Sequence, residues 1–177
     1  MAHVIIKRRV ETDNWKRLDA GASADALDQA GDLVVPLALW NASRGPIARR
    51  AGRTGVWLAA GQDAEALAPD LHALPLVAVA FPKLADGRGH STGWLLRKRL
   101  GYRGELRAFG DLIPDSLLLL ERCGFDAFEL REGEDPERAL AAFTELPTTY
   151  QASATDPLPA FRRHGSAQVL HVALETA

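Results

Sequence analysis

The stretch Leu76-Val77-Ala78-Val79-Ala80-Phe81 is an unbroken apolar run, and the polar, glycine-containing segment from Pro82 to Ser91 follows it directly. A short apolar run of this kind before turn-forming residues is typical of a strand buried on both faces of a sheet. Residues 91–100 then show helical periodicity, with Ser91 as the expected N-cap and Gly101 just past the end. The stretch therefore predicts a strand, a polar loop and a helix.

The same alternation recurs along the chain. Apolar runs at residues 33–40, 55–58, 105–109 and 126–130 precede helix-like segments at residues 41–50, 63–72, 114–123 and 135–146. Strands that alternate with helices predict an α/β fold with a mainly parallel sheet and right-handed crossovers.

The number and arrangement of these units stay partly open. We expect about five β-α units, either in an open, flavodoxin-like sheet or in an incomplete TIM-barrel-like one, because eight units do not fit in this length. Residues 4–9 and 14–18 flank a polar segment. They predict a peripheral N-terminal hairpin or edge strand.

The chain length of 177 residues suits one domain with a substantial core. We expect a single α/β domain over residues 1–147 and an irregular tail over residues 148–177. The apolar stretch at 167–174 could add a strand or pack on a neighbouring chain, so a homodimer is one possible assembly.

Composition excludes several classes of protein. The formal net charge is -2 and the basic residues are spread along the chain, so no nucleic-acid surface is expected. The apolar runs are too short to cross a membrane, and the N-terminal charges follow an apolar run instead of preceding it, which is the reverse of a secretory signal. We therefore expect a cytoplasmic protein without membrane contact.

Metal and thiol chemistry have little support. Cys123 is the single cysteine, which excludes an internal disulfide and an iron-sulfur cluster held by cysteines of one chain. Its place before Gly124, at a predicted helix end, favours a packed thiol over a nucleophile. The five histidines lack metal-ligand spacing, so no metal site is expected and any cofactor stays unknown.

The loop after residue 81 is the predicted ligand site. Ligands of parallel α/β sheets collect where strands end and helices begin. Lys83 and Arg88 could bind an anion together with the amino end of the helix at Ser91, while Gly87 and Gly89 permit close backbone approach. Our functional hypothesis for this loop is that it binds a phosphate-bearing or other anionic ligand.

Asp86 and His90 are the candidates for proton transfer in the same loop. The alternative is a tight turn in which Asp86 binds backbone amides and Arg88 makes a structural ion pair. The glycine pattern does not decide between these readings, because it lacks the third glycine of a dinucleotide fingerprint and does not match a P-loop.

Arg107 and Asp111 come from the next predicted strand and its end. A charged side chain within a buried strand needs a partner, and Asp86, Asp111 and Glu129 are the candidates. Pairing with Asp86 or Asp111 would join two neighbouring loops into one polar cluster. A purely structural buried pair is the alternative.

Two arginine clusters and three tryptophans have simpler interpretations. Arg49-Arg50-Arg53 and Arg97-Lys98-Arg99 look like solvated helix faces, or at most a surface for a partner. Trp40, Trp57 and Trp94 lie on apolar faces and are expected in the core.

Three segments together resemble a known bacterial family. They are Phe81 to Ser91, Gly104-Glu105-Leu106-Arg107-Ala108-Phe109-Gly110-Asp111, and Arg122-Cys123-Gly124-Phe125-Asp126-Ala127-Phe128. In this order they resemble the domain of unknown function 934 family, whose members are described as oxidoreductases of sulfite reduction. The resemblance covers residues 33–146. It departs from the family pattern at Leu84, Ala85 and Ile113-Pro114.

The resemblance implies a role in assimilatory sulfite reduction. Redox chemistry has no support in the residues themselves, because the chain has no cysteine pair, flavin or nicotinamide fingerprint, or metal constellation. We therefore expect an accessory protein that binds the sulfite reductase, its electron donor or a small anion. The alternatives are an enzyme acting on a phosphorylated or carboxylated metabolite through Arg88 and Ser91, and an inactive barrel-like domain kept for assembly.

Overall fold

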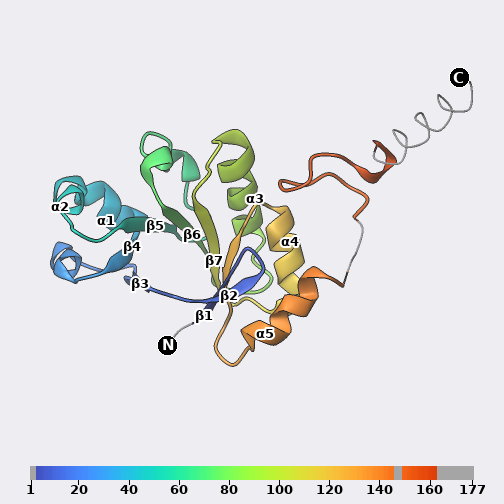
Figure 1. Cartoon of the computed structure of the whole chain (residues 1–177). Coiled ribbons are helices and arrows are strands. Elements are labelled where there is room, and N and C mark those ends of the chain that lie inside the picture. The colour runs from blue at the N-terminus through green and yellow to red at the C-terminus, as the bar shows by residue number, and fades with distance from the viewer. Residues whose placement is uncertain (1–2, 146–148, 163–177) are drawn as a thin grey trace, which may run out of the picture.

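The computed structural model describes residues 3–145 and 149–162, which form a mixed α/β fold around one curled sheet (Figure 1). The strands are β1 His3–Ile6, β2 Arg9–Thr12, β3 Trp15–Arg17, β4 Asp32–Pro36, β5 Thr54–Leu58, β6 Leu76–Phe81, β7 Glu105–Gly110 and β8 Ala127–Glu129. The α-helices are α1 Leu37–Ala42, α2 Arg44–Ala48, α3 Arg88–Trp94, α4 Leu117–Arg122 and α5 Pro136–Ala139. Short 3₁₀ turns occur at η1 Ala24–Asp28, η2 Ala64–Leu67, η3 Leu71–Ala73, η5 Pro114–Ser116 and η6 Leu140–Phe143, and a π-helical turn, η4 Leu95–Arg99, continues α3.

The sheet is mostly parallel, as predicted. Its order is β2-β1-β8-β7-β6-β5-β4-β3, and the strands from β3 to β8 pair in parallel and in chain order. The strands β1 and β2 add an antiparallel hairpin beside β8. From β3 to β8, each new strand is added on the same side of the previous one. In a flavodoxin-like sheet, by contrast, the side on which strands are added changes once.

The N-terminal segment is more than a peripheral hairpin. β2 and β3 lie at opposite ends of the strand order, yet only Asp13 and Asn14 separate them in the chain. Three residue steps span at most about 11 Å, so the two ends of the sheet lie close together and the sheet must curl. Figure 1 shows β3 extending from beside β4 toward β1 and β2.

The sheet has two buried faces of different kinds. The outer face carries Leu33, Val35, Val56, Leu58, Val77, Val79, Leu106 and Phe128, which pack with residues of the helices into the main core. The inner face is the one onto which the curled edge strand folds. It holds the smaller cluster Val34, Trp57, Leu76, Ala78 and Phe109, with Trp15 packed against it. Strand alternation places neighbouring residues on opposite faces, which explains the division.

Several predicted boundaries are wrong for identifiable reasons. Residues 37–40, predicted to extend a strand, begin α1 instead, because a short apolar run reads alike in a strand and in a buried helix. The predicted helix at 63–72 is two 3₁₀ turns, η2 and η3, and Pro69 lies between them. The helix predicted to start at Ser91 starts at Arg88, with Gly87 as its N-cap residue.

The tryptophans and the tail also differ in part from expectation. Trp57 is buried and Trp40 partly buried, but Trp94 is 52% exposed, so its predicted core position is wrong. Residues 149–162 contact the domain through the Ala154 amide, which donates to the Arg122 carbonyl at 2.8 Å. The predicted boundary at 147 and the apolar stretch 167–174 lie outside the described residues. Within 3–145 and 149–162, no helix combines the length and apolar character needed to cross a bilayer.

Candidate functional site

The segment of residues 82–88, here called the β6 loop, connects β6 to α3, includes the first residue of that helix, and lies at the carboxyl end of the parallel strands. Asp111, which follows β7, accepts a hydrogen bond from the Leu84 amide at 3.0 Å. The Asp86 amide donates to the Lys83 carbonyl at 2.9 Å. Asp111 therefore binds the β6 loop directly, without the Arg107 pairing through which we expected the two loops to join. The loop backbone is held by this hydrogen bond within the loop and by the one that Asp111 accepts.

Asp86 and Arg88 form one ion pair at the surface. Arg88 donates from Nη2 to Asp86 Oδ2 at 2.7 Å and from Nε to Oδ1 at 2.9 Å, and its backbone amide also donates to Oδ1 at 3.2 Å. These bonds, mainly the guanidinium ones, lower the pKa of Asp86 to about 2. The carboxylate is therefore ionised and occupied at neutral pH, which makes it a weak proton acceptor.

His90 and Ser91 lie inside α3 and point to different surroundings. The His90 ring packs edge-on against Phe81 with 5.3 Å between centroids, and its Nε2 is buried without a hydrogen-bond partner. Ser91 is exposed and lies in the first turns of the helix, not at its N-cap. The N-cap role predicted for Ser91 is therefore wrong, and Asp86 already occupies an amide of the first turn.

The two glycines of the segment have different roles. A Cβ on Gly89 would lie 2.4 Å from the Phe81 ring, so this glycine lets α3 pack against β6. A Cβ on Gly87 would meet nothing within 4 Å. We predicted that Gly89 lets the backbone approach a ligand; instead it lets the backbone of α3 approach Phe81.

Arg107 does not join the β6 loop. Its guanidinium is 3% exposed and binds Asp13 through Nη1 at 2.7 Å and Glu105 through Nε at 2.9 Å. Nη2 also lies 2.8 Å from Glu105 Oε1, but without hydrogen-bond geometry. The predicted pairing with Asp86, Asp111 or Glu129 is wrong. Arg107 lies within β7 beside Asp13 and Glu105, whereas Asp111 follows at the strand end and Glu129, on the same inner face, pairs with Arg17.

The inner face of the curled sheet carries polar groups that sequence reasoning missed. Arg17 pairs with Glu129 on β8, and its guanidinium carbon lies 3.9 Å from the centre of the Phe109 ring on β7. Burial raises the pKa of Glu105 at the foot of the same face. A cavity of about 280 Å³ lies here, lined by Asp13, Trp15, Lys16, Arg17, Val34, Ala78, Arg107 and Glu129.

One sequence signal could have indicated this face. In β7, Glu105, Arg107 and Phe109 alternate with the apolar Leu106 and Ala108, so one side of this strand is charged. On β3, Trp15 and Arg17 are two positions apart, so strand alternation places them on the same face, but the charged Lys16 between them gives no apolar alternation. Sequence alone could not reveal that the two strands face each other, because this depends on the curl of the sheet.

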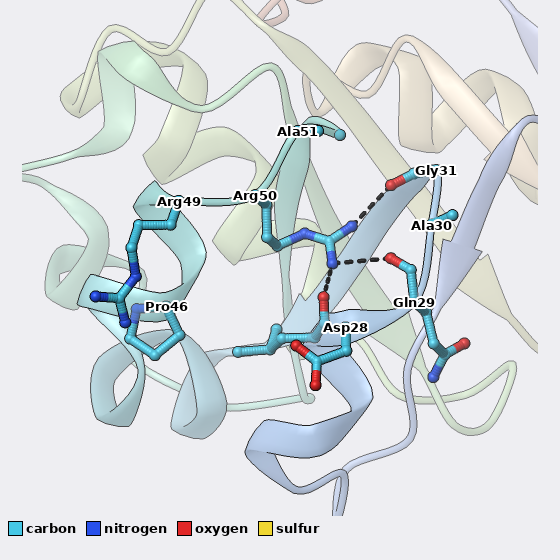
Figure 2. A pocket seen from close by; sticks show the side chains of 10 residues that line it. Asp28, Gln29, Ala30, Gly31, Pro46, Arg49, Arg50 and Ala51 are labelled. Carbon is cyan, nitrogen blue, oxygen red and sulfur yellow. Dashed lines mark hydrogen bonds between the residues drawn. The ribbon is translucent and has the colours of Figure 1, made fainter.

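Another cavity, of about 390 Å³, lies at the opposite end of the strands, between the segment 27–31 and the connection from α2 to β5. Arg50 points into it and donates to the carbonyls of Leu27, Gln29 and Gly31, whereas Arg49 points away from that segment (Figure 2). Arg50 thus ties two connections together. The expectation that it belongs to a solvated helix face is wrong, and we interpret this cavity as structural.

Arg97 also joins separate segments of the chain, so the prediction that it lies on a solvated helix face is wrong. It donates to the carbonyls of Gly124, Tyr102 and Gly104 at 2.7 to 2.9 Å and pairs with Asp126 at 2.8 Å. Cys123 is half-buried, and this burial raises the pKa of its thiol. The part of the chain that the structure describes contains no group of three or more metal-binding side chains.

Comparison with known proteins gives one match. Residues 55–161, more than half of the chain, match the family model described as "Bacterial protein of unknown function (DUF934)". The matched region includes the β6 loop, Arg107, Asp111 and Glu129, but not Asp13 or Arg17. Searches of curated proteins and of solved structures give no match.

Proposed function

The chain belongs to the DUF934 family, and from this premise we propose that it is a cytoplasmic accessory protein of sulfite reduction that binds the sulfite reductase or its electron donor through the β6 loop. The family description names no activity, so the proposal depends on the loop itself. The sulfur context comes from the sequence resemblance.

The observation that carries the proposal is an exposed loop that is held in one shape. Leu84 is 47% exposed, and the charged side chains of Lys83 and Arg88 are also exposed on either side of it. Its backbone is nevertheless fixed by Asp111, and Arg88 is fixed by Asp86. A surface ordered before binding loses less conformational entropy when a partner docks, which favours recognition.

The position of the loop agrees with a binding role. We interpret the curled sheet as an incomplete βα-barrel of about five β-α units, in which functional loops gather at the carboxyl ends of the strands. Gly61, after β5, lies against Arg88, since a Cβ there would be 3.0 Å from Nη1. Asp111 follows β7, and Arg131, after β8, lies 3.5 Å from it. Connections from four successive strands therefore support one surface.

The geometry favours binding over proton transfer. Asp86 is engaged by Arg88, and His90 turns its ring toward Phe81. An enzyme acting on a phosphorylated or carboxylated metabolite through Arg88 and Ser91 is the competing function. That function would require Asp86 to break its hydrogen bonds to the Arg88 side chain and to the Arg88 amide at the start of α3, so we favour it less.

The test is direct binding between the purified chain and a sulfite reductase or its electron donor, measured by biolayer interferometry. The variant Leu84→Asp places a charge at the centre of the loop and should weaken binding at least about tenfold. Leu119→Asp is the matched control, because Leu119 on α4 is 55% exposed and lies outside the loop.

Two results would contradict the proposal: no binding to either protein, or equal binding by the two variants. A parallel thermal-shift series with sulfite, sulfate and phosphate examines the small-anion and metabolite alternatives. Stabilisation of the wild type that disappears in Arg88→Ala would favour a small anion at this loop in place of a protein partner.

A further inference from the structure

The cavity on the inner face of the sheet is separate from the β6 loop and has its own chemistry. Its volume is about 280 Å³, near the lower end of the range for small-molecule sites. Carbon-rich walls come from Trp15, Val34 and Ala78, and charged groups of both signs line the rest. The lining holds two arginine-carboxylate pairs, Arg107 with Asp13 and Arg17 with Glu129, so the charges indicate what kind of ligand fits.

The two ion pairs differ in how firmly they are held. Arg107 and Asp13 are 3% and 8% exposed, and Glu105 also holds Arg107. Removing either partner would leave a buried charge, so this pair stays closed. Arg17 and Glu129 are 34% and 30% exposed, and an ion pair at this exposure contributes little and opens readily.

Arg17 can exchange its partner without moving. Its guanidinium carbon lies 3.9 Å from the centre of the Phe109 ring, and this cation–π contact holds the group in place independently of Glu129. A guanidinium carries five N–H donors in its plane, and Glu129 accepts from Nη1. A ligand carboxylate could therefore replace Glu129 at Arg17, provided that Glu129 receives a cation in return.

We propose that this cavity binds a small zwitterion of the amino-acid type. The ligand carboxylate pairs with Arg17, the ligand ammonium pairs with Glu129, and the ligand side chain packs on Trp15, Val34 and Ala78. One ion pair is thereby exchanged for two, so neither protein charge loses a partner. A ligand with a single charge leaves either Arg17 or Glu129 unpaired and binds less well.

This inference does not depend on the proposed partner binding, because it uses another face of the sheet. The experiment is a thermal-shift screen of the full chain against the twenty L-amino acids, followed by calorimetric titration. At least one amino acid should raise the midpoint in a saturable way. For L-valine, the matched single-charge compounds are isovalerate, which lacks the ammonium, and isobutylamine, which lacks the carboxylate; the equivalent pair is used for whichever amino acid binds best.

The variants separate the cavity from the rest of the surface. Arg17→Gln and Glu129→Gln should each weaken binding at least about tenfold, as expected for loss of one charged partner. Ala78→Leu keeps every charge but fills the cavity and should also abolish binding. Arg103→Gln makes the same chemical change at an exposed arginine outside the cavity lining and should leave the affinity unchanged.

Three results would overturn the proposal. These are no stabilisation by any of the twenty amino acids, equal binding of the single-charge compounds, or unchanged binding by both Arg17→Gln and Ala78→Leu. Failure of the reductase to bind the β6 loop would leave these measurements unaffected.

Discussion

The guanidinium of Arg107 on β7 binds the carboxylate of Asp13, with 2.7 Å between Nη1 and Oδ2, and joins residues that are 94 positions apart in the chain. Asp13 lies between the two ends of the sheet, so this pair links the junction of β2 and β3 to a central strand. It holds the sheet in its curled form from the inner face.

Asp13→Asn should therefore destabilise the fold. The substitution removes the negative partner of a buried guanidinium but leaves Glu105 in place, so we expect a loss of about 2 kcal/mol in the free energy of unfolding. Urea denaturation measures it. Glu134→Gln is the control, because the Arg131–Glu134 pair is more exposed and its loss should cost less than about 1 kcal/mol. Equal effects of the two variants would show that the inner pair does not hold the curl.

Acid sensitivity should depend in part on Asp86. Its pKa is about 2 in the folded protein, below the ordinary value of 3.8, because Arg88 stabilises the carboxylate. A lowered folded pKa gives stability that is present above the unfolded pKa and is lost as the pH falls through the folded one. Melting temperatures of the wild type should therefore fall between about pH 4 and 2 more steeply than those of Asp86→Asn. Parallel curves for the two proteins would contradict this assignment.

Gly89→Ala should destabilise the packing of α3 on β6. The added methyl group would lie 2.4 Å from the Phe81 ring, which is itself buried. Overpacking of this kind costs about 1 to 3 kcal/mol and should outweigh the helix-propensity gain of alanine over glycine, which is about 1 kcal/mol. Gly87→Ala is the matched control, since nothing lies within 4 Å of its Cβ position. Thermal unfolding of both variants distinguishes a packing requirement from a general need for glycine in this loop.

Asp111→Ala should loosen the β6 loop without unfolding the domain. The change removes the acceptor of the Leu84 amide, and the Asp111 side chain is itself 38% exposed. We expect faster hydrogen exchange at Leu84 and a global loss below about 1 kcal/mol, because the freed amide can bind water. Unchanged exchange at Leu84 would mean that Asp111 does not order the loop. A wider effect would appear as faster exchange in β7 as well.

The class of fold and the surroundings of the β6 loop can be predicted from the residues alone. The strands β4 to β8 are covered on both faces of the sheet, so they contain short apolar runs that can be recognised in the sequence. Asp111 could be placed beside the β6 loop because adjacent parallel strands end at the same edge. Asp86 and Arg88 are two positions apart, so their local ion pair could also be predicted as an alternative.

The partners of Arg107 and the position of Arg17 cannot be predicted from the sequence pattern and are seen only in the folded chain. Both depend on the curl that brings the two ends of the sheet together at Asp13 and Asn14. The curl is the sum of small twists over eight strands, and no single segment encodes it. Sequence pattern indicated that Arg107 needs a partner, because burying an unpaired charge is costly. Which carboxylate meets it was fixed only by packing across distant parts of the chain.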